Sequence, residues 1–130
     1  MDRKDDLTPA APDHYQAHRE QMASRHLLEL GAKALDARPW RPAPVPPSAV
    51  DLVQFALWRA GELAPDDLLS ALTLLPAARA EVEGLETGLL FVARAAGLTW
   101  AQIADVMGFN SPQACQQHYQ RLTARRGAGS

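Results

Sequence analysis

Cysteine is almost missing from this 130-residue sequence, since Cys115 is the only one. One cysteine excludes a disulfide within the chain and gives no reason to expect an oxidising compartment. No apolar run reaches the length of a membrane span, and the charged start Met1–Asp6 has no apolar segment of a secretory signal behind it. We therefore expect a cytoplasmic protein that makes no contact with a membrane.

Aromatic residues are also scarce, at 6% of the chain, and valine and isoleucine are few. No stretch shows the alternation of apolar and polar residues that a half-buried strand requires. Alanine, leucine, arginine, glutamate and glutamine, which favour helices, make up much of the sequence instead. The composition predicts an all-α protein.

The signatures of catalysis and metal binding are missing as well. The chain has no glycine-rich phosphate loop, no HExxH motif, no nucleophile elbow and no spaced Cys/His ligand set. His14, His18 and His26 are more simply explained as a polar, solvated helix face than as metal ligands. We expect a protein that is not an enzyme and that needs no cofactor and no metal.

The charge of the chain is nearly balanced, with a formal net charge of −2. Basic and acidic side chains balance in residues 1–47, and acidic side chains are in excess in residues 48–98. Residues 99–130 carry three arginines and one aspartate. The chain as a whole is therefore no polycation that would coat nucleic acid, and its C-terminal part is the only basic part.

Proline marks the clearest predicted boundary. Residues 1–12 read as a flexible tail and residues 13–37 as a helix, while half of the ten residues 38–47 are proline. Such a segment favours an extended polyproline connector. The N-terminal helix is then expected to pack away from the rest, or to reach a second chain as a dimerisation arm.

A helical domain is predicted over residues 48–126. Ser48 and Asp51 resemble a capping box, and Leu57 is expected to face inward on the helix that follows. A short helix begins at Pro65 and is expected to end at Pro76. This helix and a longer helix at about 77–96 are each expected to have one inward face. The first face comprises Leu68, Leu69, Leu72 and Leu75, and the second comprises Ala78, Val82, Leu85, Leu89, Val92 and Ala96, widened by Leu90, Phe91 and Ala93.

Two further helices are predicted between residues 98 and 126. Thr99 and Gln102 form a capping box for the first, which Gly108 ends in a conformation that glycine adopts at little cost. Ser111 is the N-cap of the second, with Pro112 at its first position. Residues 127–130 are expected to be a flexible tail.

This glycine-turned pair resembles the helix-turn-helix of bacterial transcription regulators, especially those of GC-rich, actinobacterial-like genomes. The resemblance lies in Thr99–Ala104, in Gly108 and in Ser111–Cys115, and the promoter-reading region of sigma factors has a similar shape. It covers a fifth of the chain, or a third with the preceding helix. It implies a helical bundle ending in a helix-turn-helix whose core comprises Ile103, Ala104, Gly108, Cys115, Tyr119 and Leu122, and Met107 would also face inward.

The resemblance implies that the last helix enters the major groove of double-stranded DNA. Gln113 and Gln117 are the first choice for base contacts, and Arg121 for a guanine or a phosphate. Arg125 and Arg126 are expected at the DNA backbone, and the amides after Ser111 at a phosphate. The complete predicted face comprises Ser111, Gln113, Gln116, Gln117, Gln120, Arg121, Arg125 and Arg126.

Two functions are compatible with this sequence. The first is a transcriptional regulator or nucleoid-associated protein that binds DNA as a homodimer, because a single copy supplies few phosphate contacts. The second is a helical adaptor that binds RNA polymerase, a sigma factor or another regulator. The acidic middle of the chain, the proline-rich segment and the leucine-rich helix favour the second.

Overall fold

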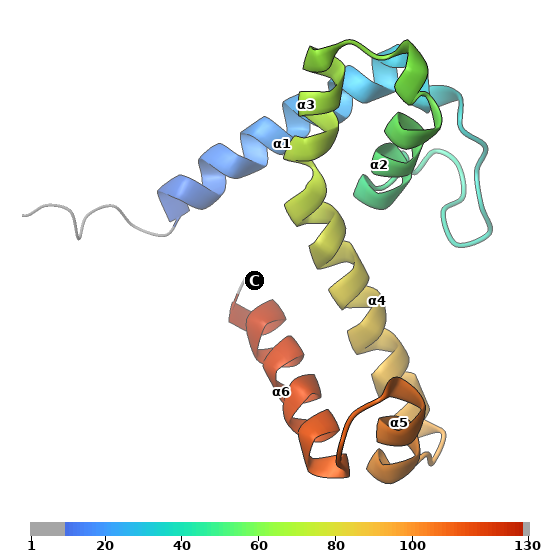
Figure 1. Cartoon of the computed structure of the whole chain (residues 1–130), viewed down its shortest axis with the longest axis vertical. Coiled ribbons are helices and arrows are strands. Elements are labelled where there is room, and N and C mark those ends of the chain that lie inside the picture. The colour runs from blue at the N-terminus through green and yellow to red at the C-terminus, as the bar shows by residue number, and fades with distance from the viewer. Residues whose placement is uncertain (1–9, 129–130) are drawn as a thin grey trace, which may run out of the picture. The chain divides into compact units, whose positions relative to one another are not determined.

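The computed structural model describes the backbone of residues 10–128 and the side chains of residues 14–125. This part of the chain is helical apart from its connections and an isolated bridge between Arg38 and Arg41, which confirms the all-α class (Figure 1). It divides into two compact units between Arg79 and Ala80, inside a helix. The boundary predicted at residues 38–47 was therefore wrong.

The first unit consists of three α-helices and two short 3-10 helices. They are α1 (Ala10–Leu30), α2 (Ala49–Trp58) and α3 (Pro65–Thr73), with 3-10 turns at Ala32–Ala34 and Ala60–Glu62. Leu27 from α1, Leu52 and Phe55 from α2 and Leu74 after α3 are buried in one cluster. These contacts build the core of the unit from all three helices.

Helix α1 belongs to this core, so the prediction of a separate dimerisation arm was wrong. It begins at Ala10, inside the predicted tail, and ends at Leu30 rather than at residue 37. Gly31 has a φ of 137°, which few L-residues adopt and which ends the helix. Residues 1–9 and 129–130 of the predicted tails lie outside the described residues, whereas Gly127 and Ala128 belong to the last helix.

The proline-rich segment folds back instead of extending as a connector. Arg38 and Arg41 exchange two backbone hydrogen bonds, of 3.1 and 2.9 Å. The Arg41 side chain is buried, its Nε lies 2.9 Å from Asp51 Oδ2, and its Nη2 donates to the Asp36 carbonyl at 2.7 Å. The segment is thus anchored to the first turn of α2. Neither the periodicity nor the composition of the sequence predicts this contact.

The second unit contains most of α4 (Leu75–Ala95), together with α5 (Trp100–Met107) and α6 (Pro112–Ala128). Pro76 does not end a helix as predicted, because it lies in the first turn of α4, where a missing N–H is tolerated. The buried core of the unit is small and comprises Leu90, Ile103, Ala104, Cys115 and Leu122.

Several predicted inward faces point to solvent. On α4 the described side chains bury Leu90, whereas Val82, Leu85, Leu89 and Val92 are more than half exposed. The expectation for α2 and α3 was also wrong at several positions, namely Leu57, Leu68, Leu69 and Leu72, which are all exposed. The periodicity marked apolar faces correctly but not the partners that cover them.

Candidate nucleic-acid interface

Helix α5 begins and ends where the sequence predicts. The Thr99 hydroxyl accepts a hydrogen bond from the Gln102 amide at 3.1 Å, and the Thr99 amide donates to Gln102 Oε1 at 2.8 Å, which completes the capping box. At the other end Gly108 has a φ of 83°, in the left-handed region. Both signals are local, so the sequence alone determines the length of this helix.

The chain turns between Gly108 and Ser111 and starts α6. The Phe109 amide donates to the Ala104 carbonyl at 2.9 Å, which satisfies an acceptor at the end of α5. The Ser111 hydroxyl accepts from the Ala114 amide at 3.0 Å, and Pro112 follows as the first helical residue. The predicted cap is confirmed, and Ser111 has its hydroxyl engaged within the chain.

One side of the α5–α6 pair faces the core of the unit. Ile103, Ala104, Cys115 and Leu122 are buried, and the ring of Tyr119 lies 5.6 Å from that of Trp100. The burial expected for Ile103, Ala104, Cys115 and Leu122 is confirmed, whereas Tyr119 is half-buried and Gly108 is exposed. Met107, by contrast, is 40% exposed, so the inward position predicted for it was wrong.

The opposite side of α6 carries polar side chains. At 100° per residue they lie across the helix from Cys115 and Leu122. The amide groups of the glutamines make no hydrogen bond within the described part of the chain, and the guanidinium of the arginine has no ion pair there. The exposed face comprises Gln113, Gln116, Gln117, Gln120 and Arg121.

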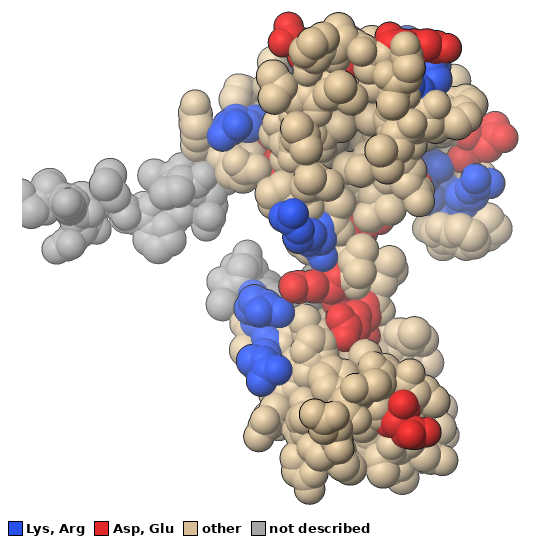
Figure 2. All heavy atoms as spheres, in the orientation of Figure 1, with Lys and Arg blue, Asp and Glu red and all other residues tan. Residues whose placement is uncertain are grey.

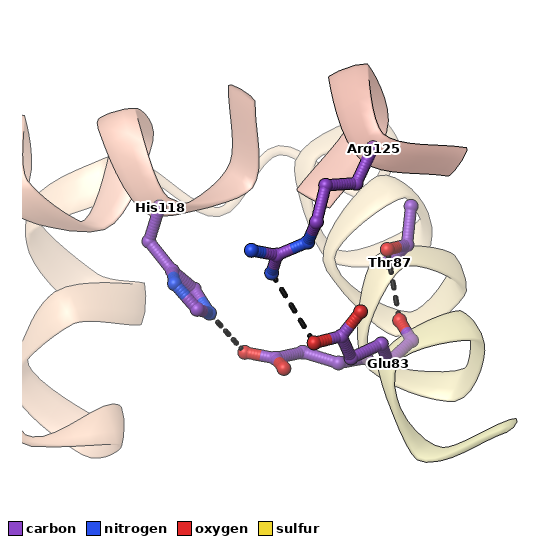
Figure 3. A network of polar contacts seen from close by, with 5 residues as sticks. Glu83, Thr87, His118 and Arg125 are labelled. Atoms are coloured by element: carbon purple, nitrogen blue, oxygen red, sulfur yellow. Dashed lines mark hydrogen bonds and ion pairs between the residues drawn. The ribbon is translucent and has the colours of Figure 1, made fainter. Parts of the chain in front are cut away.

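Arg125 has an acidic partner on α4 that the sequence did not predict. Its Nη2 lies 3.2 Å from Glu83 Oε2, so this guanidinium points toward α4 (Figure 3). A second pair joins the same two helices, since His118 Nε2 lies 2.7 Å from Glu86 Oε2. The side chain of Arg126, the last predicted contact, lies outside the described residues.

Sequence reasoning missed the acidic partners on α4. Glu83 and Glu86 are three residues apart and Leu90 follows four residues later, so all three lie on one side of the helix. That spacing, combined with the buried Leu90, is the signal that could have placed both glutamates against α6. Their negative charges offset part of the positive charge that α6 would present to a phosphate backbone.

Charges of both signs occur in this unit. On the face shown in Figure 2 uncharged residues cover most of the surface, and basic and acidic side chains lie beside one another. Among the described residues of α5 and α6, the charged side chains are Asp105, Arg121 and Arg125. A single copy therefore offers few contacts to phosphates.

A hollow of about 450 Å³ adjoins the glutamine face. Gln116 and Gln120 line it from α6, beside the rings of Trp100 and Tyr119. The Arg94 guanidinium lies 4.9 Å from the centre of the Trp100 ring, a cation–π distance. Trp100 thus has aromatic and cationic neighbours and packs between the three helices of the unit.

Other chemistry finds little support in the described part of the chain. No group of three or more histidine, cysteine or acidic residues there could hold a metal ion. Burial raises the pKa of the Cys115 thiol and the nearby Glu86 carboxylate adds to this shift, so the reactive thiolate is disfavoured. No described helix combines the length and the apolar character needed to cross a membrane.

Comparison of the chain with protein-family models, with curated proteins and with solved structures finds no match.

Proposed function

We propose that α5 and α6 form a helix-turn-helix that binds double-stranded DNA, with α6 in the major groove. The protein would act as a transcriptional regulator or nucleoid-associated protein. The observation that carries this proposal is the division of α6 into two sides. Cys115 and Leu122 hold one side in the core, while four glutamines and Arg121 are exposed on the other and have no side-chain partner among the described residues.

The chemistry of this face suits base recognition. A glutamine amide presents a donor and an acceptor, which match N7 and N6 of adenine in the major groove. Gln113 and Gln117 are four residues apart and lie at the centre of the face, so we assign base contacts to them. Arg121, one turn further along, would contact a guanine or a phosphate.

Phosphate contacts would be few. Each neutralised phosphate contributes to affinity and makes binding more sensitive to salt. Arg121 is the one described arginine of α6 without an acidic partner. Of the first amides of α6 only that of Gln113 is left for a phosphate, because Pro112 has no N–H and the Ala114 and Cys115 amides donate to Ser111. We therefore expect binding that is weak for one copy and strengthened by a second.

Binding to genomic DNA fragments tests the proposal by gel shift and fluorescence anisotropy. Gln113→Ala and Gln117→Ala should each weaken specific binding by about 5- to 100-fold, the loss typical of a base contact. Arg121→Ala should weaken binding to all fragments and reduce the salt slope by about 1 if the arginine contacts a phosphate.

Two exposed residues of the first unit provide matched controls. Gln21→Ala on α1 and Arg79→Ala at the first unit's end of α4 remove the same side chains elsewhere and should leave affinity within about twofold. Unchanged binding in all three α6 variants would reject the assigned face. No binding by the wild-type protein at low salt would reject the DNA function itself.

A groove in the first unit favours the adaptor as a second candidate. It measures about 400 Å³, lies between α2 and α3, and is lined entirely by apolar residues, among them Leu57, Leu68 and Leu72. An RNA polymerase subunit or sigma factor would place an apolar helix there. Co-purification of such a protein, lost in Leu57→Lys and retained in Gln117→Ala, together with no DNA binding at low salt, would favour this function.

A further inference from the structure

An apolar stripe runs along α4 without a covering partner. We define the α4 stripe as Val82, Leu85, Leu89 and Val92, which are between 53 and 71% exposed. At 3.6 residues per turn these four side chains fall within an arc of about 80°. The arc is turned about 100° from the side that holds Glu83, Glu86 and Leu90 against α6, so the stripe is a separate surface.

The flank of the stripe that leads toward Phe91 on the helical wheel carries mainly small residues. These are Gly84, Gly88 and Ala95, with one charged residue, Glu81, beside Val92. A Cβ placed on Gly88 would meet no atom within 4 Å, so another backbone has room to approach there. Phe91, beyond the glycine, is 63% exposed.

The area of this surface fits an interface. Each of the four side chains leaves on the order of 100 Å² of apolar surface in water, which brings the patch to the size of the largest found on an ordinary monomer. Two such stripes facing each other would bury about 800 Å² in total, and Phe91, which points about 140° away from the centre of the stripe, adds nothing to this. That is the size of a weak, reversible association and not of a permanent interface.

The spacing of the stripe identifies its partner. The four residues are separated by three, four and three positions, so the pattern Val-Leu-Leu-Val reads the same in both directions. Ala78 and Ala96 extend this symmetry by four positions on each side. A two-fold axis that crosses the stripe at the level of residue 87 would place Val82 against Val92 of a second copy, and Leu85 against Leu89.

We propose that two copies of this chain pair through the α4 stripe as an antiparallel helix pair. A two-fold interface requires a surface that is complementary to itself, and the palindromic stripe has this property. The stripe carries no charge that would select an oppositely charged partner. Gly88, at the rim of the stripe, puts no side chain in the way of the second copy. The pairing depends on α4 alone and not on DNA binding.

The mass of the full chain in solution tests the pairing by sedimentation equilibrium. The wild type should have twice the 14.1 kDa of one copy, and Leu85→Lys/Leu89→Lys should raise the dimer dissociation constant by at least about 100-fold. The matched control Leu57→Lys/Leu72→Lys places the same charges on exposed leucines of the first unit and should leave the dimer intact. Circular dichroism of each variant should retain the wild-type helix content.

Cysteine cross-linking tests the antiparallel register. A mixture of the Leu85→Cys and Leu89→Cys variants should form more disulfide-linked dimer than either variant alone, because the pairing brings these two positions within bonding distance. Three results would each overturn the proposal. They are a wild type that stays monomeric at high concentration, a dimer that survives Leu85→Lys/Leu89→Lys, and a dimer that is lost in the control variant instead. Preferential linkage of Leu85→Cys to itself would overturn the antiparallel arrangement.

Discussion

Asp67 ties the first turn of α3 to α1 through its carboxylate. His26 Nε2 lies 2.7 Å from Oδ1, and the Ala64 amide donates to Oδ2 at 2.8 Å. The hydrogen bond from His26 and then that from Ala64 hold the pKa of this carboxyl below its ordinary value of 3.8. The unfolded chain therefore binds a proton here at a higher pH than the folded chain does.

This difference predicts an acid-dependent loss of stability. The contribution of Asp67 to the free energy of unfolding is complete above pH 3.8, the ordinary pKa of the carboxyl. It is lost as the pH falls from there through the lower pKa of the folded state. Asp67→Asn should be less stable than the wild type at pH 7, and the gap should narrow below pH 3.8. Urea unfolding from pH 7 to the acid limit measures this.

Asp66 provides the control for that experiment, because it is exposed in the same turn of α3 and has no described partner. Asp66→Asn should follow the pH dependence of the wild type. A constant gap between Asp67→Asn and the wild type across the whole range would show that this carboxylate does not titrate differently in the folded protein.

Single residues also show where sequence reasoning reached its limit. The N-caps Ser48, Thr99 and Ser111 were predicted correctly because each depends on residues within three positions. The ion pair of Arg125 was not predicted, because its partner Glu83 lies 42 positions away in the sequence. A contact of that kind depends on how helices pack, which local patterns do not specify.

At the scale of elements, the turn between α5 and α6 depends on Gly108. Its φ of 83° costs other L-residues about 1–2 kcal/mol, although a Cβ there would meet no atom within 4 Å. Gly108→Ala should therefore destabilise the second unit by strain and not by a clash. The buried Cys115 thiol is the probe of that unit, since it reacts with a thiol reagent when the unit opens.

The labelling rate of Cys115 should rise about 5- to 30-fold in Gly108→Ala, which corresponds to 1–2 kcal/mol. Gly108→Asn should show a smaller increase, because asparagine tolerates this conformation better. Gly61→Ala, in the first unit and in open space, should leave the rate unchanged. A wild-type rate in Gly108→Ala would mean that the turn adopts another conformation in solution.

The helices themselves were largely predictable, but their faces were not. Apolar spacing identified the helix at 77–96, and the structure places α4 at Leu75–Ala95. The same spacing predicted that Leu85 and Leu89 face the core and that Leu90 widens this face, and of the three only Leu90 is buried. Periodicity indicates that a face is apolar but not what covers it. Nothing in the described part of a single copy covers the α4 stripe, and we therefore propose that a second copy does.

At the scale of the whole molecule, the net charge of −2 works against DNA binding. Glu83 and Glu86 lie on α4 against α6 and pair with Arg125 and His118. Both side chains of the Glu83–Arg125 pair are more than 40% exposed, so this ion pair contributes little to the stability of the protein. Its larger effect, under the proposed function, is to withhold one arginine from the phosphate backbone.

Removal of this acidic partner should therefore tighten DNA binding. Glu83→Gln keeps the shape of the side chain, deletes its charge and frees the Arg125 guanidinium. We expect affinity for DNA to rise by about 3- to 10-fold at 0.1 M salt, with a salt slope steeper by about 1, because one more phosphate is neutralised. Fluorescence anisotropy over a series of salt concentrations measures both quantities, and Cys115 labelling checks that the second unit stays folded.

The control separates the local pair from the charge of the molecule. Glu29→Gln removes the same charge from an exposed position on α1 that has no described partner, so affinity should stay within about twofold. Equal gains in both variants would assign the effect to net charge and not to Arg125. No gain in Glu83→Gln, in a protein whose wild type binds DNA, would mean that Arg125 does not face the duplex even when it is released. The polar face of α6 would then bind DNA without it.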